Sequence, residues 1–175
     1  MNDVIEPLLR EREATEHSED RRLWVRRAIL TLLFAVSVLA LFNVFGQRAG
    51  TSTVRSSAAD LTVHAPSRVR AGLLFQAKIT IVAHRELPKA SLVLGNGWFD
   101  GLTINTNEPQ ASSESSGPGG GAILQLGSLS PGETYVHYLE FQVNPTSIGS
   151  RTQRVTVRSD GVPLVSFSHG LTVFP

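Results

Sequence analysis

The stretch from residue 126 to residue 143, LGSLSPGETYVHYLEFQV, joins a tight turn to a strand with alternating side chains. Pro131 presets the backbone angle φ at the second position of a type II turn, and Gly132 supplies the positive φ of the third position. From Tyr135 to Val143 apolar and polar residues alternate with a period of two. This pattern predicts a strand with one face on a core and the other face in water.

Other runs on both sides of this stretch have the same period of two. The clearest is Leu74–Ala83, whose odd positions are apolar from Phe75 to Ile81 and whose even positions include Gln76 and Lys78. Together the runs predict about seven to nine short strands between turn signals in residues 60–175. The predicted fold class is therefore all-β, an Ig-like antiparallel β-sandwich. A closed barrel is the alternative.

The turn itself has the form LG-x-L-x-PGE and is followed by a tyrosine. It resembles the tyrosine corner of fibronectin type III domains, in which the tyrosine packs inward and its hydroxyl bonds an upstream backbone group. The longer form is similar to bacterial extracellular Ig-like repeats of the CARDB (cell-adhesion-related) group. The resemblance covers residues 60–175 and implies that Tyr135 makes a buried hydrogen bond. Leu129, which precedes the turn, is expected to close the bottom of the core.

The same resemblance bears on function. These families consist mostly of adhesive, spacer or scaffold modules without shared catalytic residues, so a non-enzymatic role is implied. The chain departs from the group in having one copy of the domain on an anchor, where such repeats often occur in tandem.

An uncharged apolar segment, AILTLLFAVSVLALFNVF, occupies residues 28–45. Its 18 residues span about 27 Å as a helix, close to the thickness of the hydrocarbon core of a bilayer. Trp24 precedes it, at the depth where interfacial aromatic side chains lie. A cleaved signal peptide is the rival interpretation, but its apolar core is shorter and ends at a small-x-small site. We therefore expect an uncleaved transmembrane helix that anchors the chain in membrane lipid.

The cations around this segment predict its orientation. Those before it are Arg10, Arg12, Arg21, Arg22, Arg26 and Arg27, whereas those soon after it are Arg48 and Arg55. Because arginine and lysine are retained on the cytoplasmic side, the N-terminus is expected inside the cell. The expected location is the plasma membrane, with a single-pass helix and an extracytoplasmic C-terminal domain.

Four segments follow from these patterns. Residues 1–27 form a cytoplasmic tail, either a marginal helix or disordered, and residues 28–45 form the transmembrane helix. Residues 46–59, which include the small and polar run GTSTVRSSAA, are expected to form a flexible linker. Residues 60–175 form the sandwich.

The composition offers little for catalysis or cofactor binding. The chain has no cysteine and a net charge of +1, which excludes disulfides and thiolate sites and gives no sign of nucleic-acid binding. The histidines at positions 64, 84, 137 and 169 lack metal-ligand spacing. Oxygen ligands for calcium at Asp100, Asn105, Asn107 and Glu108 do not form a dense acidic loop. No enzyme, metal or cofactor is therefore predicted.

The segment GNGWFDG, residues 95–101, places two large aromatic side chains between glycines. Trp98, Phe99 and Asp100 are candidates for contact with a protein partner, because tryptophan is enriched in binding hot spots. The alternative is that Trp98 or Phe99 caps the core. Their opposite parity allows one to be buried and the other exposed.

Two functions remain open at this level. The first is a non-enzymatic, membrane-anchored module that binds or supports another envelope or membrane protein. The alternative is a ligand-sensing or accessory subunit of an envelope enzyme or transport complex.

Overall fold

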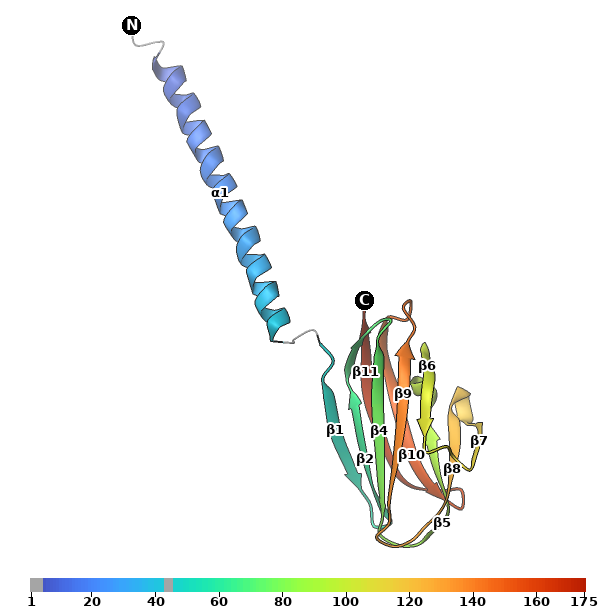
Figure 1. The fold of residues 1–175 in the computed structure, drawn as a ribbon. Helices are drawn as coiled ribbons and strands as arrows, with labels where there is room; N and C mark the ends of the chain where they lie inside the picture. Colours follow the sequence, from blue (N-terminus) through green and yellow to red (C-terminus); the bar gives the residue numbers. More distant parts are fainter. Residues whose placement is uncertain (1–4, 43–45) are drawn as a thin grey trace. The chain divides into compact units, whose positions relative to one another are not determined.

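The computed structural model describes residues 5–42 and 46–175, with side chains described from residue 21 onward. The chain divides into two compact units, Met1–Phe45 and Gly46–Pro175. Figure 1 shows a long helix in the first unit and packed strands in the second.

Helix α1 extends over Ile5–Leu41, so the part of the tail from Ile5 is helical. The 21 residues Arg21–Leu41 have a mean hydropathy of 1.8 and are not buried, which makes them long and apolar enough to cross a membrane. The hydroxyl of Ser37 donates to the carbonyl oxygen of Leu33 at 2.8 Å, which satisfies this polar group within the helix. Residues 43–45 of the expected span lie outside the described residues.

The part of the chain described from residue 46 onward contains eleven strands in two sheets. The first sheet has the order β1-β2-β4-β9-β6, formed by β1 (Ala49–Arg55), β2 (Ala59–Pro66), β4 (Leu74–Ala83), β9 (Thr134–Val143) and β6 (Leu102–Glu108). The second has the order β3-β11-β10-β5-β8-β7, formed by β3 (Arg68–Arg70), β11 (Val162–Phe174), β10 (Gly149–Ser159), β5 (Leu87–Leu94), β8 (Ala122–Leu129) and β7 (Ser113–Ser116). The two sheets stay separate, with edge strands at both ends of each, so the fold is a sandwich and the barrel alternative is wrong.

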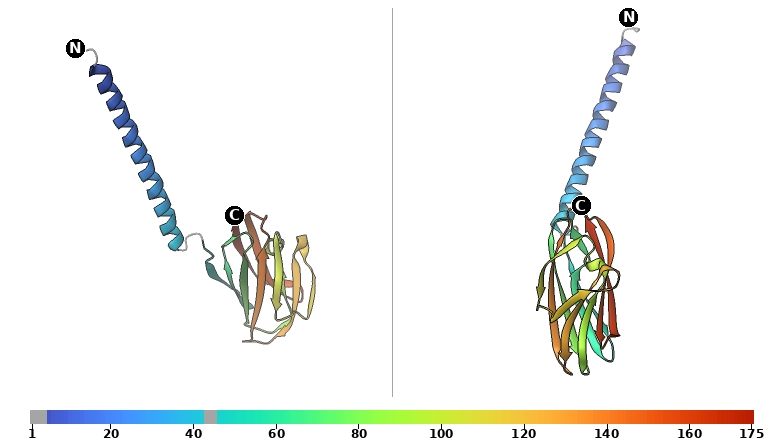
Figure 2. Two further views of the ribbon diagram at one scale, coloured as in Figure 1. Left: turned by 45° about the horizontal axis from the view of Figure 1, so that its top comes forward. Right: turned by 90° about the vertical axis from the view of Figure 1, so that its right-hand side faces the viewer.

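The core lies between the sheets and is built by the predicted alternation. Strands β4 and β9 pair antiparallel, with Phe75 opposite Phe141 and Ala77 opposite Leu139. All four side chains are buried, while the intervening positions are more exposed. Figure 2 shows the two layers edge-on. An all-β sandwich preceded by one apolar helix is therefore confirmed.

The turn before β9 has the predicted geometry. Gly132 has a φ of 82°, and the amide of Glu133 donates to the carbonyl oxygen of Ser130 at 3.0 Å, as a type II turn requires. Leu129 is only 2% exposed and closes this end of the core.

The expected flexible linker is the main difference in the fold. Residues 49–55 form β1, which pairs with β2 from Ala49 to Arg55. The hydroxyl groups of Thr53 and Thr62 lie 2.9 Å apart across this pair. Small size and polarity suggested a linker, but threonine is β-branched and forms cross-strand pairs well, so a polar run suffices for an edge strand. Together with the short strands β3 and β7, β1 raises the count above the seven to nine expected.

Candidate interaction surfaces

The aromatic turn follows β5 and contains a short 3₁₀ helix, η1 (Asn96–Trp98). The Trp98 side chain is fully buried and stacks on Phe141, with 5.4 Å between ring centroids. Its indole nitrogen donates to the carbonyl oxygen of Arg154 on β10 at 3.1 Å. A fully buried ring does not touch a partner, so Trp98 caps the core and its assignment to a partner surface is corrected.

The glycines of this turn let it pack closely on β10. A Cβ added at Gly97 would collide with the carbonyl group of Thr152, and Gly101 has a φ of 65° beside Ser147. The guanidinium of Arg151 donates to the carbonyl oxygen of Asp100, and to the hydroxyl of Ser147 at 3.0 Å. The turn is thus a fixed part of the scaffold, held by backbone contacts that only glycine permits.

The other two predicted contact residues differ from Trp98. Phe99 is partly buried and packs against the core, whereas the side chain of Asp100 is exposed. Of the three predicted contact residues, only Phe99, in part, and Asp100 therefore reach the surface of this turn. Contact with a partner at these two residues stays a prediction.

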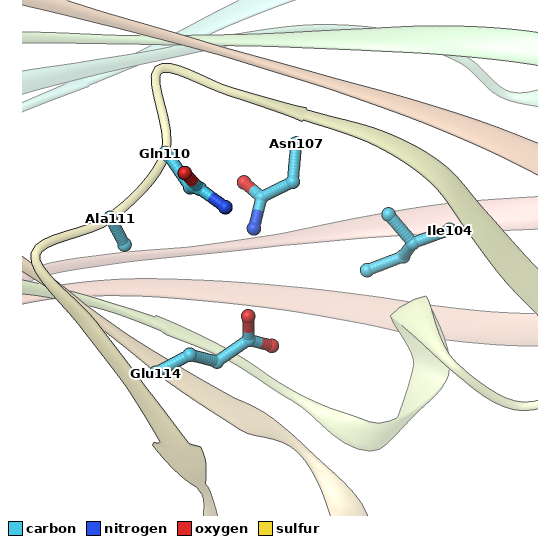
Figure 3. A pocket seen from close by; sticks show the side chains of 5 residues that line it. All are labelled: Ile104, Asn107, Gln110, Ala111 and Glu114. Carbon is cyan, nitrogen blue, oxygen red and sulfur yellow. The ribbon is translucent and has the colours of Figure 1, made fainter.

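A groove of about 550 Å³ lies at the side of the sandwich where β6 and β7 are the edge strands of their sheets. Its lining residues are Ile104, Asn107, Gln110, Ala111 and Glu114. Figure 3 shows the side chains of Asn107, Gln110 and Glu114 gathered around one space. Asn107 comes from β6, Gln110 from the connection between the sheets and Glu114 from β7. The groove therefore exists because two sheets meet there, and it is termed the edge groove below.

The edge groove offers hydrogen-bond acceptors. The side-chain oxygen Oδ1 of Asn107 is buried and has no hydrogen-bond partner among the described residues. A buried acceptor without a hydrogen-bond partner destabilises the folded protein, so a donor that pairs with it removes this cost. Glu114 adds an exposed carboxylate on β7, a strand with all four residues exposed. In the sequence, Asn107 was considered only as an oxygen ligand for calcium. The segment 110–114 has no periodic pattern, so the sequence did not predict a groove there.

Tyr135 and His137 form a ring pair inside the sandwich. Their rings stack with 6.0 Å between centroids, and the Tyr135 hydroxyl lies 3.3 Å from Nδ1 of His137. The corner resemblance implied a backbone partner for this hydroxyl, but its contact is with His137. The reason is that residues two apart on a strand share a face, which brings the rings together. Burial lowers the pKa of His137 and raises the pKa of Tyr135.

The free energy of unfolding is expected to fall as the pH drops below about 6.5, because folded His137 resists protonation while the unfolded chain accepts a proton at the ordinary pKa. The contribution is fully present above that pH and is lost between it and the lowered pKa of the folded state. Urea unfolding of the full chain at neutral pH and at about pH 5 measures it. His137→Leu should flatten the pH dependence; an unchanged dependence contradicts the assignment.

The other histidines of the sandwich have structural contacts. His64 lies 2.7 Å from the hydroxyl of Thr51, His84 lies 2.9 Å from the carboxylate of Asp60, and His169 lies 3.0 Å from the carbonyl oxygen of Pro66. Among the side chains that the structure describes, those of residues 21–42 and 46–175, no three from histidine, cysteine, aspartate or glutamate come together as a metal site would require.

No protein-family model matches the sequence, and no curated protein is similar to it. Solved structures do resemble the chain. A crystal structure of a CARDB domain from Pyrococcus furiosus, in complex with di-metal ions, has 19% identity and a TM-score of 0.41, covering 70% of this chain and 95% of that one. A solution structure of CaCohA2 from Clostridium acetobutylicum has 14% identity and a TM-score of 0.45, covering 71% and 96%. CARDB domains, the group that the corner sequence resembles, are thus among the solved structures similar to this chain.

Proposed function

We propose that this chain is a non-enzymatic, membrane-anchored module whose sandwich binds or supports another membrane or envelope protein. The edge groove is the observation that carries this proposal, because it combines a buried acceptor without a partner and an exposed carboxylate beside an edge strand. The apolar part of α1, Arg21–Leu41, supplies the anchor.

The arrangement proposed for the membrane follows from charge. Four arginines, at positions 21, 22, 26 and 27, lie at the start of the apolar span, and only Arg48 and Arg55 follow soon after it. The positive-inside rule then places the N-terminus in the cytoplasm and the sandwich outside it, at the plasma membrane. A binding site on the sandwich would therefore meet extracytoplasmic segments of other proteins.

The proposed occupant of the edge groove is an extended protein segment with a basic side chain. Among the described residues, β7 pairs with β8 alone, so one side of its backbone is open to another strand. The exposed carboxylate of Glu114 accepts hydrogen bonds, which arginine and lysine donate. Oδ1 of Asn107 is a buried acceptor without a partner among the described residues, and it is proposed to pair once the partner displaces its cover. Phe99 and Asp100 precede β6, whereas Asn107 lies near its end, so these two residues are proposed as a second, separate contact of the same partner.

Photocrosslinking in native membranes tests this function. A photoreactive residue at Gln110, which is exposed and lines the groove, is expected to give a discrete crosslinked protein. The same group at Val162, which is 59% exposed and lies outside the groove, serves as the control and should give none. Equal products from both positions would contradict a partner site in the groove.

Charge reversal sharpens the test. Glu114→Lys is expected to reduce the Gln110 crosslink about tenfold or more, because it places a cation against the basic side chain of the partner. Glu86→Lys reverses the charge of another exposed glutamate, outside the groove, and should leave the crosslink unchanged. A similar loss in both variants would mean that the contact depends on overall charge and not on the groove.

A further inference from the structure

One end of the sandwich exposes more large apolar side chains than the rest of its surface. At this end β1 begins with Ala49, β4 begins with Leu74, β10 begins with Gly149 and β11 ends with Phe174. Because the chain coming from α1 enters the sandwich here, it is termed the tethered end. Figure 1 shows the C-terminus at the same end of the sandwich as the start of β1.

Large apolar side chains are exposed mainly at the tethered end. Leu73, Leu74, Ile148 and Phe174 are 46%, 50%, 57% and 44% exposed. In the sandwich as described, only Tyr138 and Val162 are other large apolar residues with comparable exposure. Four of six therefore gather at one end, although they come from three separate segments of the chain. Such a cluster on a solvent face indicates contact with something apolar.

Backbone contacts hold these segments together. The amide of Ala71 donates to the carbonyl oxygen of Phe174 at 2.8 Å, and the amide of Val143 donates to the carbonyl oxygen of Leu73 at 3.0 Å. Gly149 is opposite Val173, so the preceding Ile148 lies beside Phe174. The four apolar side chains thus belong to one rim, not to scattered loops.

Exposed arginines border this rim. Arg68 and Arg70 are exposed on β3, and they are opposite Thr172 and Phe174 of β11. Apolar side chains at the tip suit contact with acyl chains, and the arginines beside them suit contact with phosphate headgroups. The combination fits the boundary region of a bilayer. The tethered end has the chemistry of a surface that rests on anionic lipid.

The length of the connection keeps this end near a bilayer. Helix α1 ends at Leu41 and β1 begins at Ala49, with only residues 42–48 between them. Even fully extended, eight residue steps span at most about 29 Å. A short tether also raises the effective concentration of lipid at the rim, so a few apolar contacts suffice for binding.

We propose that the tethered end of the sandwich docks on the surface of the bilayer that holds α1. Leu73, Leu74, Ile148 and Phe174 enter the headgroup region, while Arg68 and Arg70 bind lipid phosphates. This proposal rests on the membrane anchoring proposed above. Its consequence is that the edge groove, whose residues Asn107 and Gln110 follow β6 away from the tethered end, stands clear of the lipid and is open to a partner.

The absence of cysteine makes site-specific fluorescent labelling clean. Two variants of the full chain, Ile148→Cys and Val162→Cys, are each labelled at the new cysteine with the environment-sensitive dye NBD and reconstituted in vesicles. The native side chains at these positions are 57% and 59% exposed. The vesicles contain phosphatidylcholine and phosphatidylglycerol, with doxyl quenchers attached near the lipid headgroup. The dye at 148 is expected to shift to the blue and lose most of its emission, whereas the dye at 162 is unchanged. Equal quenching at both positions, or none at either, overturns the proposal.

Arginine substitutions identify the lipid group. Arg68→Gln together with Arg70→Gln is expected to weaken docking about fivefold for each arginine on anionic vesicles, but little on vesicles of phosphatidylcholine alone. Arg85→Gln, an exposed cation in the loop between β4 and β5, is the matched control and should have no effect. Equal weakening by the control overturns specific docking. A chain that fails to co-float with the vesicles disproves the anchor instead, which separates the two proposals.

Discussion

Replacing Trp98 with alanine is expected to lower the free energy of unfolding of the sandwich by about 3–5 kcal/mol. The side chain is fully buried, stacks on Phe141 and donates a hydrogen bond to the carbonyl oxygen of Arg154. Its removal leaves a cavity between the sheets and an acceptor without its donor. Urea unfolding of the full chain, followed by circular dichroism of the strands, measures the loss.

The neighbouring residue provides the control for this prediction. Phe99 lies in the same turn but is only partly buried, so Phe99→Ala should cost about 1–2 kcal/mol. A loss for Trp98→Ala no larger than for Phe99→Ala would show that Trp98 does not cap the core. A small effect of Phe99→Ala on stability, combined with loss of the crosslink at Gln110, would support its proposed contact with a partner.

Gly97→Ala is expected to destabilise the sandwich by about 3 kcal/mol, although it adds one methyl group. The new Cβ would meet the carbonyl group of Thr152, which is backbone of β10 and has little freedom to move. The turn must therefore lift from β10, and Trp98 must shift with it. In a Trp24→Phe background Trp98 is the single tryptophan, so its emission should move to the red.

Gly170→Ala is the matched control, with the opposite expected sign. Gly170 lies within β11, has no atom within 4 Å of an added Cβ, and its φ is outside the left-handed region. Alanine there should raise stability by about 0.5–1 kcal/mol, because glycine loses more backbone freedom on folding. If both variants were neutral, the close approach of the turn to β10 would be wrong.

The alternation in β4 and β9 made the core predictable. Phe75, Leu139 and Phe141 occupy the buried positions that a period of two assigned to them, because successive side chains of a strand point to opposite faces. The turn at Pro131–Gly132 was equally predictable, since proline and glycine select its backbone angles. The run Arg21–Leu41 is recognisable by its composition alone.

Strand β1 and the edge groove were not predictable in this way. The polar run 49–55 becomes a strand because β2 lies beside it, a neighbour that no local pattern reveals. Asn107 and Glu114 line one groove because two sheets end side by side there, and no spacing in the sequence encodes that meeting. The partner of the Tyr135 hydroxyl likewise depends on the ring of His137 rather than on the corner motif.

By itself, the sequence determined that this protein has an apolar span followed by an all-β sandwich, because strand periodicity and hydropathy are properties of single segments. Only the tertiary structure decided which of Trp98 and Phe99 is buried, since the answer depends on the packing of their turn against β10. It also decided that Leu73, Ile148 and Phe174 share one rim, because long-range strand pairing joins segments far apart in the chain. The candidate interaction surfaces depend on such long-range pairings. For this reason the fold could be predicted from the sequence, whereas the candidate sites could not.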